Sequence, residues 1–134
     1  MRVVELYGYE IAPSANLSGA NLWGANLLKA DLKNANLSRA DLRQANLFGA
    51  NLFGANLNNA NLSGANLREA DLTDACSTFA DLVGADLTNA NLTNTDLTNA
   101  DLTRANLTNA NLHDANLTNA NLFGAIMSDG IIHA

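Results

Sequence analysis

Leucine recurs at every fifth position from Leu17 to Leu122, in 21 of 22 consecutive slots. Alanine usually stands two residues before it, and Asn or Asp directly before it. In an α-helix, five residues turn through about 500°, so successive leucines would be spread around the whole cylinder. In a flat strand side chains alternate, so an odd period would send neighbouring leucines to opposite faces. The repeat therefore predicts short extended pieces joined by corners, with leucine and alanine turned inward.

The residue types that follow each leucine indicate where the corner lies. Two residues after the leucine, Gly occupies seven units and Asn seven more. Both tolerate the positive φ that the third residue of a type II turn requires. Each unit thus has an alanine slot, an Asn/Asp slot, a leucine slot, an outward slot and a corner slot, in that order.

Units such as Ala-Asn-Leu-Trp-Gly at 20–24 and Ala-Asp-Leu-Thr-Arg at 100–104 closely resemble the pentapeptide-repeat family. The resemblance covers residues 15–124. It implies an all-β fold, a right-handed quadrilateral parallel β-helix with four pentapeptides per coil. On that geometry the 22 repeats make about 5.5 coils.

The chain is predicted to form one solenoid domain with a cap at each end. Residues 15–124 form the repeat domain, residues 1–14 the N-terminal cap and residues 125–134 the C-terminal cap. Both end segments are apolar and depart from the repeat. An open coil end exposes core and unpaired backbone, so these segments are interpreted as covers. An end-to-end dimer contact is the alternative for the C-terminal segment.

One interior unit breaks the pattern. Ser77 is the single leucine slot without leucine, and Cys76 replaces Asn or Asp before it. Such a change in a leucine core costs about 2 to 5 kcal/mol unless the space is filled. We expect Phe79 or a water to fill it. Thr95 in an alanine slot is a smaller irregularity, tolerated by local hydrogen bonding.

No enzymatic site is visible in the sequence. A nucleophilic Ser77 or reactive Cys76 would need a general base, and His113 falls on another side of the coil, nearly two coils away. Paired catalytic carboxylates, a metal cluster and a phosphate-binding loop are also missing from the pattern. We therefore expect no enzyme, no catalytic residue, no cofactor and no metal ion, and we interpret the faulted unit as a degenerate repeat.

Charge is divided unevenly along the chain. Residues 1–67 carry a net charge of +1 and residues 68–134 a net charge of −7. We name Asp81, Asp86, Asp96 and Asp101 as a candidate acidic face. Direct nucleic-acid binding is not expected, because it requires basic stripes. The resemblance implies an alternative function, a DNA-mimicking inhibitor or protector of DNA gyrase. The uninterrupted repeat and the short rod depart from the relatives that act in this way.

The outward slots of the first coils hold an unusual group of large side chains. They are Trp23, Leu28, Phe48 and Phe53, with Lys33 among them. Exposed aromatic residues flanked by basic groups are typical of protein-binding surfaces. The alternative is that single exposed aromatics need no explanation and that each phenylalanine packs along its own column.

These features together favour a non-enzymatic structural or protein–protein interaction module whose partner is a protein. We expect a monomer, or a weak homodimer formed through the terminal caps or the apolar patch. No stretch approaches the roughly 20 apolar residues of a membrane span. Neither a membrane association nor a secretion signal is predicted, and the expected location is the cytoplasm.

Overall fold

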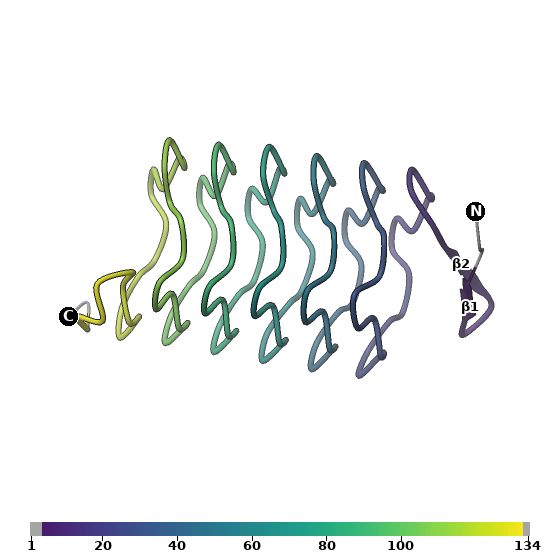
Figure 1. Cartoon of the computed structure of the whole chain (residues 1–134), viewed down its shortest axis with the longest axis horizontal. Coiled ribbons are helices and arrows are strands. Elements are labelled where there is room, and N and C mark those ends of the chain that lie inside the picture. Colours follow the sequence, from purple (N-terminus) through teal and green to yellow (C-terminus); the bar gives the residue numbers. More distant parts are fainter. Residues whose placement is uncertain (1–3, 133–134) are drawn as a thin grey trace.

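The computed structural model describes residues 4–132 and shows a rod of stacked coils with a short hairpin at its N-terminal end (Figure 1). The hairpin consists of β1 (Val4–Leu6) and β2 (Tyr9–Ile11), which pair antiparallel. The other extended pieces are too short to form named strands and pair through single bridges, all parallel except the antiparallel bridge of Ile126 with Ile132. The described residues contain no helix.

The bridges set the coil at twenty residues. Residues in the Asn/Asp slots pair with residues twenty positions later, from Asn16 with Asn36 to Asn106 with Ile126. Three hydrogen bonds recur between neighbouring coils. From Leu17 to Leu107, each leucine-slot N–H donates to the Asn/Asp-slot carbonyl of the next coil, and from Asn36 to Ile126, each Asn/Asp-slot N–H donates to the alanine-slot carbonyl of the previous coil. Corner-slot N–H groups donate to the outward-slot carbonyl of the next coil, for example Gly19 to Ser38 at 2.8 Å. A coil therefore contains four pentapeptides and four corners, which confirms the predicted architecture.

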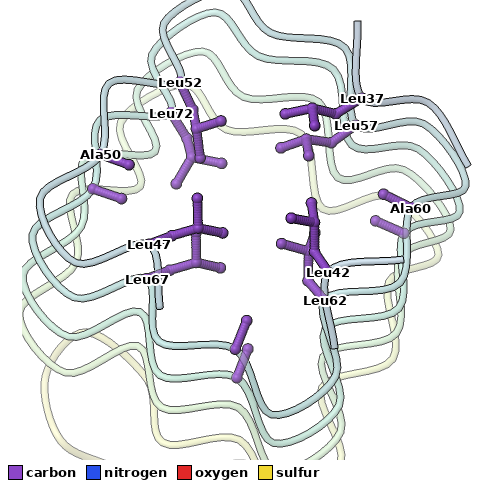
Figure 2. Packing of buried hydrophobic residues seen from close by; sticks show 14 of the residues in the cluster. Leu37, Leu42, Leu47, Ala50, Leu52, Leu57, Ala60, Leu62, Leu67 and Leu72 are labelled. Carbon is purple, nitrogen blue, oxygen red and sulfur yellow. The ribbon is translucent and has the colours of Figure 1, made fainter. Parts of the chain in front are cut away.

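The leucines fill the interior in four columns. From Leu17 to Leu107 each is at most 3% exposed, and the alanines beside them are buried too, apart from the two partly covered ones at residues 15 and 30. Figure 2 shows the columns from close by, with pairs one coil apart: Leu37 and Leu57, Leu42 and Leu62, Leu47 and Leu67, Leu52 and Leu72. Burial of a leucine side chain stabilises the fold by about 1.5 to 3 kcal/mol before the entropic cost.

The corners lie where the sequence predicts them. Every corner-slot residue from Gly19 to Gly124 has a positive φ. The alanine that follows donates its N–H to the preceding leucine carbonyl, for example Ala25 to Leu22 at 3.0 Å. Even Phe79, at φ 58°, adopts this conformation. The ladder on both sides of each corner imposes a backbone geometry that bulky residues rarely choose.

The two ends of the rod differ. At the N-terminal end the hairpin covers the core, and Ser14 N–H already donates to the Lys33 carbonyl at 2.8 Å. At the other end, Ile126 continues the ladder and Met127 takes a leucine slot. The leucines of the last coil remain partly exposed. The predicted boundaries of the caps stay predictions, and their outermost residues, 1–3 and 133–134, lie outside the described residues.

The space at Ser77 is not filled by Phe79, and a water in this space stays a prediction. Ser77 is buried, and its Oγ has no hydrogen-bond partner among residues 4–132. Phe79 does not fill the space, because its corner position directs the ring outward and leaves it 61% exposed. On the next coil Thr95 is fully buried and donates its hydroxyl to the Leu72 carbonyl at 2.7 Å. We infer that the larger Thr95 side chain takes up part of the volume that Ser77 leaves.

If the two residues compensate each other, their substitutions are not additive. Thr95→Ala alone is expected to lower the free energy of unfolding by about 1 to 2 kcal/mol, because it widens the space and removes a hydrogen bond. In a Ser77→Leu background the same change should be neutral or stabilising. Urea unfolding of the four variants measures the coupling, which we expect to reach about 1 kcal/mol. Additive effects would show that Thr95 and Ser77 are independent.

Candidate functional site

The outward side chains of the first coils form two adjoining columns. Leu28 lies next to Phe48 in one column, and Lys33 lies next to Phe53 in the other. The Lys33 ammonium is 5.4 Å from the centre of the Phe53 ring, within the range of a cation–π interaction. Leu28 is 52% exposed, whereas both phenylalanines are half-buried. Each phenylalanine is thus partly covered, in keeping with packing along its own column.

Trp23 lies on the preceding side of the coil and is 56% exposed. It borders an open hollow together with Tyr7, Tyr9 and Asn21. The Tyr9 hydroxyl accepts the Asn21 N–H at 3.2 Å and so satisfies one backbone group at the start of the ladder. The structure therefore groups Trp23 with the tyrosines of the hairpin. We call Trp23, Leu28, Lys33, Phe48 and Phe53 the N-terminal surface.

A pocket that the sequence did not predict adjoins Leu28. Its volume is about 230 Å³. One wall comes from the hairpin and its continuation, with Val4, Leu6 and Pro13, and the other from residues 26–31 of the first coil. No repeat pattern could indicate it, because it forms between an irregular segment and the coil edge.

The four carboxylates of the candidate acidic face are not brought together. Asp81 and Asp101 are bridge partners in one column, but Asp86 and Asp96 belong to two other sides of the coil. Each accepts the N–H two residues later through Oδ1. Asn residues in the same slot do the same throughout the rod, for example Asn91 with Thr93. This slot therefore has a structural role on every side.

Three carboxylates in this slot have a pKa below the ordinary value of an aspartate. The side-chain hydrogen bond from Arg43 lowers the pKa of Asp41, and the hydroxyl of Thr98 lowers that of Asp96. Burial raises the pKa of Asp86, but hydrogen bonds from Thr88 and Arg68 outweigh it, so the result is also lowered. Ionised carboxylates are the better acceptors in these contacts.

A lowered pKa in the folded state stabilises the fold above the unfolded pKa of about 3.9 and loses this effect as the pH falls through the folded pKa. We therefore expect the urea concentration at the unfolding midpoint to decrease as the pH is lowered from about 5 to about 3. Asp96→Asn keeps the backbone acceptor but cannot ionise, so its midpoint should fall less. Asp74→Asn, a change in a corner slot, controls for the loss of one charge. An identical pH dependence in wild type and Asp96→Asn would contradict the assignment.

In the unit around Cys76, a side chain of the previous coil supplies the missing hydrogen-bond acceptor. Cys76 is an exposed free thiol and offers no amide oxygen to Thr78. Instead, Asn58 Oδ1 accepts both the Thr78 N–H, at 2.9 Å, and the Thr78 hydroxyl, at 2.8 Å. Asn58 is the only asparagine in an outward slot of residues 15–124. Its unusual position was the available signal, and the sequence interpretation missed it.

Asn58→Thr should lower the free energy of unfolding by about 1 kcal/mol, because Thr78 loses both contacts. In a Cys76→Asn background the same substitution should cost almost nothing, since an amide oxygen then stands in the regular slot. A double-mutant cycle by urea unfolding measures the difference. Equal costs in the two backgrounds would mean that Asn58 acts through another contact.

Two negative findings complete the site. Within residues 4–132, no group of three or more His, Cys, Asp or Glu side chains is placed to hold a metal ion. Over the same range, no helix has the length and apolar character needed to cross a membrane.

Comparisons with known proteins agree with the fold. The sequence matches the pentapeptide repeats, in eight copies, over residues 14–47, 50–89 and 90–129. The solved pentapeptide-repeat protein Rfr23 from the cyanobacterium Cyanothece 51142 is 35% identical, with a TM-score of 0.76 over 79% of this chain and 86% of that one. A pentapeptide-repeat protein from the thylakoid lumen of Arabidopsis thaliana is 37% identical, with a TM-score of 0.71 over 74% of this chain and 69% of that one.

No curated protein matches the chain. The family match extends over most of the chain, and the solved relatives share its stacked coils. The protein belongs to the pentapeptide-repeat family, and its fold is the right-handed quadrilateral parallel β-helix of that family.

Proposed function

We propose that the protein is a non-enzymatic interaction module that binds a partner protein through the N-terminal surface. The observation that carries this proposal is the exposure of Trp23 and Leu28, each more than half exposed in the first coil. Both adjoin hollows that the hairpin forms with the coil. Apolar side chains that border a hollow are typical anchors of protein interfaces.

The rest of the wall supports this choice by contrast. Beyond Phe53, the outward slots hold mostly threonine, and apart from Thr78 these hydroxyls bond to the Asn or Asp of their own unit, as in Thr93 and Thr108. The hydroxyls of such side chains already have hydrogen-bond partners within the protein and offer little to a partner protein. Val83 is partly covered. Of the two exposed phenylalanines, Phe79 occupies a corner slot and Phe123 lies near the C-terminal end of the rod.

A second copy of the chain is one partner that fits the same surface, so a weak homodimer is included in the proposal. The candidate acidic face does not favour the DNA-mimic alternative, because its carboxylates are divided among three sides and bonded within their own units. The cytoplasm stays a prediction, and one relative comes from the thylakoid lumen.

The combined variant Trp23→Ser/Leu28→Ser should lose at least about tenfold in partner capture from a lysate of the native cell, since each apolar anchor is worth about 1 to 2 kcal/mol. Phe123→Ser is the matched control, because Phe123 occupies the same kind of slot and is similarly exposed at the far end. Exposed substitutions of this kind should leave the urea midpoint almost unchanged. Equal capture by the two variants would place the interface elsewhere.

A further inference from the structure

The first coil leaves part of its backbone edge unpaired beside the pocket. One coil further on, Asn46 accepts a leucine N–H at 2.8 Å and donates its own N–H to an alanine carbonyl at 2.9 Å. The equivalent N–H and carbonyl of Asn26 have no backbone partner among residues 4–132. The same holds for the Leu28 carbonyl and for the N–H and carbonyl of Asp31. This edge therefore presents the same donors and acceptors as the ladder, but no neighbouring backbone among residues 4–132 pairs with them.

The hairpin explains why this edge is unpaired. With a coil of twenty residues, residues 6–11 would regularly stack on residues 26–31. Instead the chain reverses at Tyr7 and Gly8, which have φ values of 55° and 80°, and Leu6 pairs with Tyr9. The hairpin therefore covers the core but makes no ladder with this part of the first coil.

The pocket combines this edge with apolar walls. Val4, Leu6 and Pro13 line one side, and Leu28 lies on the other. Asn26 and Asp31 are exposed residues and both line the pocket, so another chain can reach this edge. A peptide can pair with a free edge and place side chains into an adjoining pocket, as in β-augmentation. Residues 27–30 form a corner, with Lys29 at φ 54° and the Ala30 N–H donating to the Leu27 carbonyl at 3.0 Å, so a peptide paired with this edge must turn with it.

The charges near the pocket favour an acidic peptide. Among residues 4–132, Lys29 and Lys33 form no ion pair, whereas Arg43 is paired with Asp41 at 2.7 Å. Lys29 is part of the pocket wall, and Lys33 lies two residues beyond it. Asp31 supplies a single opposing carboxylate at the same edge. Two lysines beside an apolar pocket suit a segment that carries an acidic residue next to an apolar one.

We propose that this pocket binds, by β-augmentation, a segment of a partner protein that continues the ladder along residues 26–31 and turns with their corner. An apolar side chain of the segment enters between Val4, Leu6 and Leu28, and an adjacent acidic side chain meets Lys29 or Lys33. The proposal rests on the proposed function and names the kind of partner segment that the N-terminal surface takes.

The test is an NMR titration of the isotope-labelled full chain with an end-blocked peptide, Ala-Asp-Leu-Thr-Asn-Ala, the sequence of residues 85–90. Binding in the millimolar range, about 4 kcal/mol, is expected for so short a segment. The largest shifts should fall on the Asn26 and Asp31 amides, because these N–H groups gain a partner. Two control peptides separate the contributions. One replaces Leu with Ser, and the other carries an N-methyl group on the Leu nitrogen, which removes one main-chain donor.

Each control peptide should bind at least about fivefold more weakly, since it lacks either the apolar anchor or a main-chain hydrogen bond. Leu28→Ser should weaken binding of the parent peptide, and Phe123→Ser should leave it unchanged. Equal binding of the N-methylated peptide, or shifts away from residues 26–31, would overturn the proposal, as would no binding up to about 10 mM. Loss of partner capture in Trp23→Ser/Leu28→Ser without peptide binding would retain the proposed function and reject β-augmentation.

Discussion

The inward packing of one leucine and one alanine per unit is the constraint on which the rest of the structure depends. Four leucine columns fill the interior, so each side of the coil is only as wide as one short extended piece. The chain must then turn every five residues, and twenty residues return it to the same column. This return brings Asn/Asp-slot residues into the parallel ladder and forces every corner slot from Gly19 to Gly124 to positive φ. Period, corner and ladder are consequences of one packing requirement.

The same requirement explains how much of the molecule the sequence could predict. A pattern that repeats in every unit reports the inner columns and the corners, so both were predicted correctly. Phe79 was one of the two expected fillers of the space at Ser77, and for Phe79 this was wrong, since the corner backbone turns its ring outward. The bond from Thr78 to Asn58 joins two coils. Such a contact requires knowing which residues stack, and it is not visible within a single unit.

The candidate site was only partly predictable for a related reason. Trp23 and Leu28 stand out because their slot is usually polar, and both are exposed as expected. The pocket depends on the hairpin of β1 and β2, for which residues 1–14 contain no repeat to predict from. The reversal at Tyr7 and Gly8 takes the chain off the ladder and leaves the edge at residues 26–31 free. The free edge and the pocket therefore arise where the chain departs from the repeat, and the repeat pattern cannot predict such a departure.

The regular wall and the irregular end consequently have different capacities for recognition. Along the wall, Asn and Asp side chains bond the backbone of their own unit, and threonine hydroxyls bond to them in turn. These groups are largely satisfied, and successive coils offer similar surfaces that give a partner no unique register. The N-terminal end combines three features at one place on the rod. They are unpaired backbone groups, an apolar pocket and two lysines that form no ion pair among the described residues. Specific binding requires a unique combination of contacts, so the start of the ladder is better suited to it than any repeated part of the wall.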